Sequence, residues 1–139
     1  MNMKRRELRE NIFKIIFHIT EKTETSEGLI SYYFDDNEIR GKDKKYVENE
    51  VNGIIGNLGT VDEIIEKNLK NYSFDRISKV SLALLRVAVY EIMYEEEIPD
   101  AVAISEAVTL SEIYEDEKAK TFVNGILGSV VRQKNASGE

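Results

Sequence analysis

Apolar residues along this chain recur with the 3.6-residue period of an α-helix almost everywhere, and no segment alternates between apolar and polar positions as a strand does. The pattern predicts about seven helices. Their expected ranges are about 4–21, 27–34, 43–58, 61–69 and 75–95, then one helix after Pro99 and a last one around 122–131. We therefore expect an all-α fold of two packed helical sub-bundles.

Local signals predict where one pair of these helices meets. Gly59 stands where a glycine commonly ends a helix, here the helix over about 43–58. The next residues, from Thr60 to Glu63, have the pattern of a capping box. In such a box the threonine hydroxyl and the glutamate carboxylate satisfy free amide groups at a helix start. A new helix is therefore predicted to begin at Val61, with Thr60 as its cap.

The predicted helix over 75–95 differs from the others because it has no polar face. It is apolar on every side between Ile77 and Met93. A helix that is hydrophobic all round is buried, so we expect it at the centre of the domain.

A chain of 139 residues fits a single domain with its own core. We expect that domain over residues 1–134, with sub-bundles over about 1–72 and 73–134. Residues 135–139 are small and polar, and they are predicted to form a flexible tail.

The sequence also limits where the protein works. It contains no cysteine, which excludes disulfides and thiolate zinc sites and favours a reducing compartment, the cytoplasm by default. No apolar run approaches the roughly 18 residues of a membrane-spanning helix, and no secretory leader is evident. We expect no association with a membrane.

Residues that could catalyse a reaction are scarce. The one histidine, His18, lies beside apolar neighbours on the first predicted helix, which favours a structural or surface role. The sequence contains no Gly-x-Ser-x-Gly, no phosphate-cradling glycine loop and no His-Glu-x-x-His motif. Acidic runs at 95–97 and 115–117 are typical of solvated helix ends. We predict a non-enzymatic protein without catalytic residues, metal or cofactor.

Positive charge is concentrated at the amino terminus. The net charge is −7, but residues 1–14 contain five cations and two anions, a balance of +3, which leaves the other 125 residues at −10. Arg5, Arg6 and Arg9 fall within about 100° of arc on the first helix and are predicted to project from one side of its start. Arginine suits phosphate oxygens and base edges, so these three are candidate nucleic-acid ligands. An ordinary solvated first turn is the alternative.

Arg86 is a charge inside an apolar run, over residues 82–89. Burying an unpaired guanidinium group is costly. Arg86 therefore either pairs with a carboxylate such as Glu91 or Glu106, or it reaches a surface where a ligand binds.

A second group of candidates precedes the apolar stripe of the last helix. Lys118 and Lys120 form either an ordinary polar first turn or a second basic edge beside Phe122. The Phe122 ring is a candidate for contact with a base, and a place in the core is the alternative.

Three segments in the carboxy-terminal half, taken in order, resemble the signature of the bacterial NusB family of transcription antitermination factors. They are Leu85-Arg86-Val87-Ala88-Val89-Tyr90-Glu91-Ile92, then Ile98-Pro99 with Val102-Ala103-Ile104-Ser105-Glu106-Ala107-Val108-Thr109-Leu110, and finally Phe122-Val123-Asn124-Gly125-Ile126-Leu127. The spacing between the segments fits as well.

The resemblance implies an all-α domain of two sub-bundles that binds the boxA element of ribosomal RNA leader transcripts. It also implies a protein partner, the ribosomal protein NusE, and an indirect association with RNA polymerase in an antitermination complex. A homodimer is compatible with it. The RNA-binding residues expected on this basis are Arg5, Arg6, Arg9, Arg86, Lys118, Lys120 and Phe122.

A second function from a different class is a protein-interaction or self-associating helical scaffold whose basic helix start touches no RNA. The two functions differ in one measurable property. RNA binding through arginine predicts an affinity that falls with salt, whereas the scaffold predicts no RNA affinity to titrate.

Overall fold

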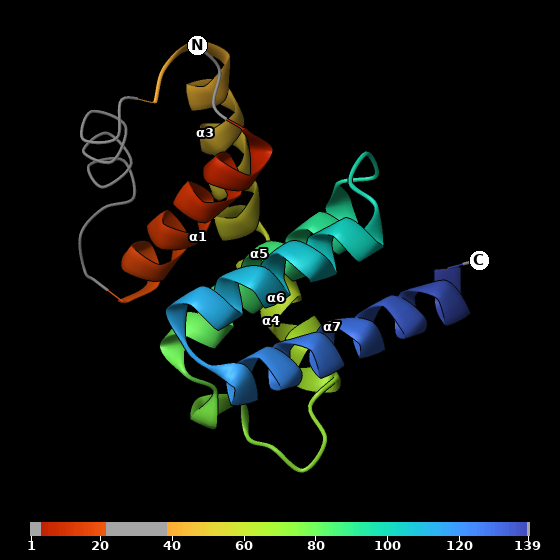
Figure 1. Cartoon of the computed structure of the whole chain (residues 1–139). Helices are drawn as coiled ribbons and strands as arrows, with labels where there is room; N and C mark the ends of the chain where they lie inside the picture. Colours follow the sequence, from red (N-terminus) through yellow and green to blue (C-terminus); the bar gives the residue numbers. More distant parts are fainter. Residues whose placement is uncertain (1–3, 22–38, 139) are drawn as a thin grey trace. The chain divides into compact units, whose positions relative to one another are not determined.

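A computed structural model describes residues 4–21 and 39–138 (Figure 1). These residues form helices and contain no strand, which confirms the all-α class. The predicted helix over 27–34 lies outside the described residues. The described elements are α1 (Arg5–Glu21), α3 (Gly41–Gly56), α4 (Leu58–Lys67), a 3-10 turn η1 (Phe74–Arg76), α5 (Lys79–Tyr94), α6 (Asp100–Tyr114) and α7 (Glu117–Gly138).

The chain forms two compact units, Met1–Gly56 and Asn57–Glu139. The boundary therefore lies one helix earlier than the predicted position near residue 72. The reason is packing: α4 lies against α5 and α7, so it belongs to the second unit.

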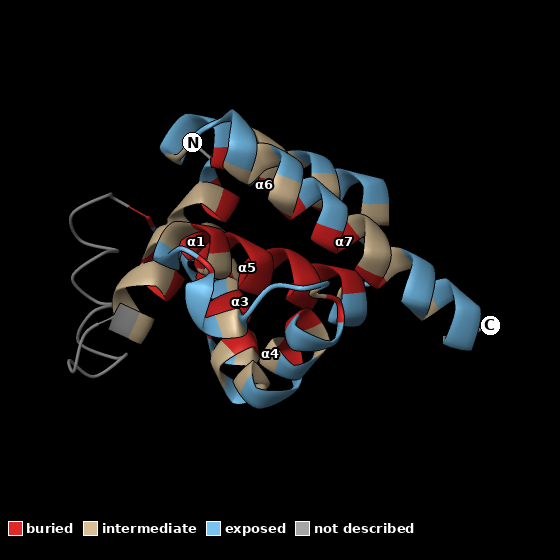
Figure 2. Ribbon diagram, turned by 90° about the horizontal axis from the view of Figure 1, so that it is seen from below, coloured by how far each residue is buried: buried red, intermediate tan, exposed pale blue. Residues whose placement is uncertain are grey.

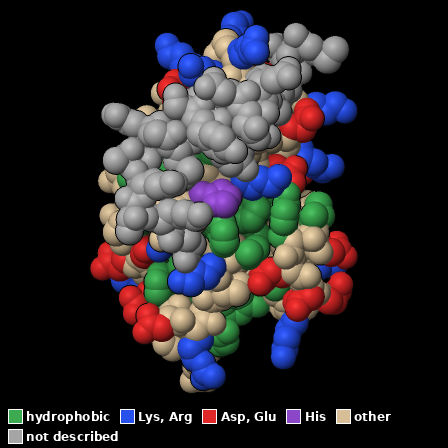
Figure 3. Space-filling view, turned by 90° about the vertical axis from the view of Figure 1, so that its left-hand side faces the viewer, with side chains coloured by type: hydrophobic (Ala, Val, Ile, Leu, Met, Phe, Trp, Pro, Cys, Tyr) green, Lys and Arg blue, Asp and Glu red, His purple; other side chains and the backbone are tan. Residues whose placement is uncertain are grey.

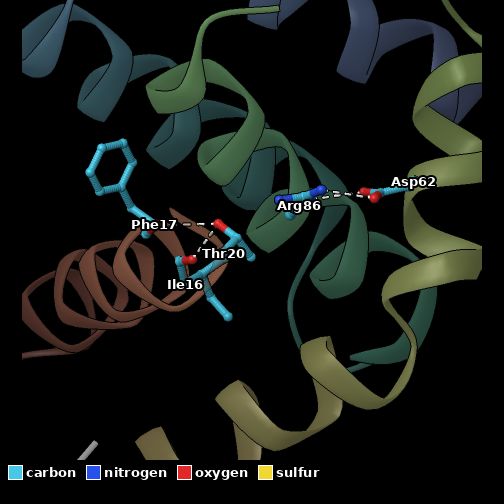
Figure 4. A network of polar contacts seen from close by, with 5 residues as sticks. All are labelled: Ile16, Phe17, Thr20, Asp62 and Arg86. Carbon is cyan, nitrogen blue, oxygen red and sulfur yellow. Dashed lines mark hydrogen bonds and ion pairs between the residues drawn. The ribbon is translucent and has the colours of Figure 1, made fainter. Parts of the chain in front are cut away.

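In the first unit, α1 packs against α3 through the apolar stripes that the periodicity predicts. The residues of this core are almost fully buried, and the ribbon of Figure 2 is red where residues are buried. They are Leu8, Ile12, Ile15 and Ile16 from α1, with Val47, Val51 and Ile54 from α3. Near the end of α1, the Thr20 hydroxyl donates a hydrogen bond to the carbonyl of Ile16, at 2.8 Å (Figure 4).

In the second unit, α5 packs against α4, α6 and α7 and carries an almost unbroken band of buried residues (Figure 2). This confirms its predicted central place. The helix is shorter at its start than predicted, because the chain first makes η1 and then extends through Ile77 and Ser78. Ser78 caps α5: its hydroxyl oxygen accepts a hydrogen bond from the amide of Ser81, at 3.1 Å.

The junction between α3 and α4 differs from the prediction. Gly59 does not end a helix, and Thr60 does not cap one, because both lie inside α4. The break falls at Asn57, which has φ −117° and ψ 18° and whose side chain makes no capping hydrogen bond. Asparagine tolerates turn conformations better than most residues, and this preference outweighed the glycine and threonine signals.

The last helix continues further than predicted and includes residues 135–138 of the expected tail. Lys134 holds it to the rest of the unit. The Lys134 Nζ donates to the carbonyl of Ile92, at 3.0 Å, and to Oδ1 of Asp100, at 2.9 Å. One ammonium group therefore joins α7 to the end of α5 and the start of α6.

Asn68 makes three side-chain hydrogen bonds, one within α4 and two to α7, and its removal is expected to destabilise the second unit. Its Nδ2 donates to the Ile64 carbonyl at 2.8 Å and to Gln133 Oε1 at 3.0 Å, while its Oδ1 accepts from Ser129 Oγ at 2.6 Å. Because Asn68 is buried, Asn68→Ala leaves partly buried partners unsatisfied, which costs about 1–3 kcal/mol. Urea unfolding measures the loss.

The matched control is Asn124→Ala, which truncates an exposed asparagine on α7. It is expected to leave the free energy of unfolding unchanged or slightly raised, because alanine favours a helix. Equal effects of the two changes would show that the Asn68 hydrogen bonds contribute nothing to stability.

Candidate nucleic-acid interface

The arginines at the start of α1 do not all face outward. Arg5 and Arg6 are exposed, but Arg9 is only 7% exposed. Arg9 is buried because it lies one helical turn before Ile12 and Phe13, on the face of α1 that carries the core. The prediction that three guanidinium groups project from one side is therefore wrong for Arg9.

Arg5 is held in place by an aromatic ring. Its guanidinium carbon lies 3.9 Å from the centroid of the Tyr46 ring on α3, a cation–π contact. A guanidinium group stacked by its face keeps its N–H groups at the edge, where they can donate to a phosphate. The contact also places the start of α1 beside the first turns of α3.

The start of α3 adds cations that the sequence analysis missed. Side chains of Lys and Arg gather at the top of Figure 3, where α1 and α3 begin. The exposed cations of α3 and of the residue before it are Arg40, Lys42, Lys44 and Lys45. We call these four, with Lys4, Arg5 and Arg6, the basic surface of the first unit. The sequence does indicate this basic surface, because residues 40–45 contain four cations and one anion.

Arg86 is paired inside the second unit. Its Nε and one terminal nitrogen each donate to a different carboxylate oxygen of Asp62, both at 2.8 Å (Figure 4). Arg86 is 9% exposed, and Asp62 lies on α4, 24 residues earlier. The expected pairing is thus present, but with Asp62 and not through the two carboxylates considered from the sequence. The guanidinium fork is already occupied by this carboxylate.

A cleft of about 380 Å³ opens on the second unit. It forms where η1 and the start of α5 lie near the start of α7 (Figure 1). Its size lies within the range of about 300–1,000 Å³ that is common for ligand sites. The residues that line it are Tyr72, Arg76, Ser78, Ser81, Glu115, Asp116, Lys118, Ala119 and Phe122.

Two aromatic rings form one wall of this cleft. The rings of Tyr72 and Phe122 lie with their centroids 5.0 Å apart and tilted by 43°. Phe122 is half-buried, and Tyr72 is 45% exposed. Tyr72 follows Asn71, whose φ of 56° turns the chain, and its hydroxyl donates to the Arg76 carbonyl at 3.2 Å. Asparagine is among the few residues that adopt this left-handed conformation readily.

The two lysines near this wall have different surroundings. Lys118 is exposed and lines the cleft. Lys120 forms ion pairs with Glu117 at 3.4 Å and Glu112 at 3.6 Å. The hydrogen bond to Glu117 and the charges of both carboxylates raise the pKa of Lys120 above its ordinary value. Of the predicted basic edge, only Lys118 faces the cleft.

Comparison with known proteins decides the family. The sequence profile of the NusB family matches residues 6–132. The transcription antitermination protein NusB of Clostridium botulinum is 38% identical over 133 residues, which cover 94% of this chain and 100% of that protein. This chain belongs to the NusB family. The same protein of Listeria monocytogenes is 38% identical over 92% of this chain and 96% of its own length.

Solved NusB structures have the same fold. T. maritima NusB superposes with a TM-score of 0.87 and 33% identity, covering 96% of this chain and 94% of that one. A crystal structure of antitermination factors NusB and NusE in complex with dsRNA contains a chain with a TM-score of 0.85 and 28% identity, covering 93% of this chain and 96% of that one. The NusB resemblance predicted from three sequence segments is confirmed.

Membership in the NusB family confirms the prediction of a non-enzymatic protein, because the relatives that match this chain over nearly their full length are transcription antitermination proteins. Among the residues that the structure describes, no three histidine or acidic side chains come together as a metal site. None of the described helices is long and apolar enough to cross a membrane. Two candidate ligand surfaces lie within the part of the chain that the structure describes: the basic surface of the first unit and the aromatic cleft of the second.

Proposed function

We propose that this protein binds single-stranded boxA-type RNA of ribosomal RNA leader transcripts jointly with the ribosomal protein NusE. The observation that carries the proposal is the cleft in which the rings of Tyr72 and Phe122 lie beside Lys118 and Arg76. Unpaired bases stack on aromatic side chains, and cations at the rim meet the adjoining phosphates. The cleft therefore suits a splayed single strand better than a paired helix.

The basic surface of the first unit is proposed to hold the RNA backbone. Arg5 and Arg6 are exposed, and the Tyr46 ring orients the Arg5 guanidinium. Contacts of this kind position a nucleic acid without reading its sequence. Arg9 and Arg86 are not proposed to contact RNA, because both are buried and Arg86 directs two of its N–H groups at Asp62.

NusE is proposed as the protein partner on two grounds, the negative charge of this chain and its similarity to a NusB chain solved with NusE. Outside residues 1–14 the chain carries −10, which is complementary to a highly basic ribosomal protein. A similar solved structure holds NusB together with NusE and RNA. Association with RNA polymerase would then be indirect, through the antitermination complex in the cytoplasm, and a homodimer stays a prediction.

Removing two phosphate contacts is expected to weaken RNA binding and its salt dependence together. For a single strand, log K falls by about 0.7 per contact for each tenfold rise in salt. The double variant Arg5→Ala with Arg6→Ala should therefore lower the salt slope by about 1.4 and the affinity at 0.1 M salt roughly 20-fold. A salt-titrated binding assay with a boxA oligonucleotide measures both quantities.

The control removes the same charge elsewhere. Lys67→Ala with Arg132→Ala changes two exposed cations that line neither surface, so its salt slope should match that of the parent chain. If the Arg5 and Arg6 variant kept both the affinity and the slope of the parent, the proposed phosphate contacts would be absent. No RNA binding by the parent chain, alone or with NusE, would favour the scaffold function.

A further inference from the structure

One carboxylate in the aromatic cleft is held in place by two hydroxyl groups. Glu115 lies in the turn between α6 and α7 and lines the cleft. Its Oε1 accepts hydrogen bonds from Ser78 Oγ at 2.8 Å and from Ser81 Oγ at 2.6 Å. Both serines belong to the start of α5, more than 30 residues before Glu115 in the sequence. The packing of α5 near the turn between α6 and α7 therefore fixes this side chain.

This carboxylate has no evident use in a surface that only binds phosphate. A negative charge there repels the RNA backbone and offsets the positive charge of Lys118 and Arg76, which line the same cleft. Its neighbour Asp116 has a structural use, since its Oδ1 caps α7 by accepting from the Ala119 amide at 2.8 Å. Both serines bond to Oε1 of Glu115, and no hydrogen bond within the described residues uses Oε2.

We propose that Glu115 reads the exocyclic amino group of an unpaired base that stacks on the Tyr72 and Phe122 rings. The inference rests on the proposed RNA-binding function and adds a base preference to it. Oε2 accepts a hydrogen bond from the N4 amino group of cytosine. Uracil carries the carbonyl oxygen O4 at the same position, and that oxygen repels a carboxylate. Among pyrimidines, the cleft therefore prefers cytosine.

The serines act as positioning residues for this contact. A glutamate side chain has three rotatable bonds, and orienting it at the moment of binding would cost conformational entropy. The two hydroxyl groups orient the carboxylate in advance and occupy the oxygen that the base does not use. The loss of one hydroxyl group should therefore reduce the cytosine preference without abolishing it.

The test compares oligo(C) with oligo(U) of equal length, bound to the full chain at one salt concentration. The two probes have the same backbone charge and ring size, so the ratio of their affinities isolates the base edge. A hydrogen bond to a charged group predicts a preference for oligo(C) of about 10-fold in the parent chain. Glu115→Gln should reduce this ratio to unity or below, because the serine hydroxyls hold the amide oxygen and leave toward the base an NH2 group, which donates to O4 and cannot accept from N4.

Two further variants test whether the base preference comes from Glu115 itself and from its hydrogen bonds to the serines. Asp116→Asn removes the same charge from the same cleft while keeping the helix cap, and its ratio should equal that of the parent. Ser81→Ala removes one hydroxyl group that bonds to Oε1, and its ratio should fall between the parent and Glu115→Gln. Circular dichroism confirms that each variant is folded.

The outcomes separate the two proposals. RNA binding with a cytosine preference that Glu115→Gln abolishes supports the base contact. RNA binding with equal affinities for the two probes, or with a ratio that Glu115→Gln leaves unchanged, overturns the base contact and keeps the RNA function. Failure of the parent chain to bind either probe or a boxA oligonucleotide overturns both.

Discussion

Asp62→Ala is expected to lower the free energy of unfolding by about 3 kcal/mol, because it leaves a buried guanidinium group without its partner. Arg86 is 9% exposed and directs two N–H groups at the Asp62 carboxylate, each at 2.8 Å. The Asp62 side chain is 26% exposed, so in the variant water can reach the position of the lost carboxylate and solvate part of the Arg86 guanidinium group. The loss of stability therefore falls at the lower end of the range for broken buried pairs. Urea unfolding measures the loss.

Removing Arg86 alone is expected to lower the free energy of unfolding less than removing Asp62 alone. Arg86→Leu leaves Asp62, which can reach water, and should cost only about 1–2 kcal/mol. The double variant Asp62→Ala with Arg86→Leu should recover more than half of the loss caused by Asp62→Ala, since no charge then stays buried. A double-mutant cycle gives the coupling energy directly.

An exposed ion pair serves as the control for this experiment. Glu112→Ala removes a carboxylate 3.6 Å from the Lys120 ammonium, with the Glu112 side chain 55% exposed. Pairs of this kind contribute about 0–1 kcal/mol, so the change should be near the error of the measurement. Equal losses from Asp62→Ala and Glu112→Ala would contradict the structural importance of the Arg86 pair.

Replacing both rings of the cleft wall, Tyr72→Ala with Phe122→Ala, is expected to weaken boxA binding roughly 30-fold. Base stacking on an aromatic side chain contributes about 1–3 kcal/mol, and 2 kcal/mol corresponds to this factor. The change removes no charge, so the salt dependence of binding should stay that of the parent chain. This combination, lower affinity at an unchanged salt slope, distinguishes the cleft from the basic surface.

A tyrosine outside the cleft provides the matched control. Tyr94 is 42% exposed, close to the 45% of Tyr72, and it stacks on Tyr90 with ring centroids 5.1 Å apart. Tyr94→Ala should therefore leave the RNA affinity unchanged. An equal loss with Tyr94→Ala, or none with the cleft variant, would remove the stacking wall from the proposed function.

The sequence pointed to two of the residues that line the cleft but not to the geometry that brings the lining together. Lys118 and Phe122 were singled out from a short stretch of sequence, and both line the cleft. Tyr72, Arg76 and Glu115 were not, because nothing local marks them: they reach the cleft only when the start of α7 packs near η1 and α5. The exposed cations from Arg40 to Lys45 do have a local signal in the sequence, because four of the six residues in this stretch are Lys or Arg.

The sequence by itself determined the all-α class, the buried position of α5 and the family, because hydrophobic period and segment order are properties of neighbouring residues. Only the tertiary structure decided that Arg9 faces the core, that Asp62 pairs with Arg86, and that two serines hold Glu115 in a cleft. Such contacts join residues up to 37 positions apart. They depend on how whole helices pack, which no local pattern records.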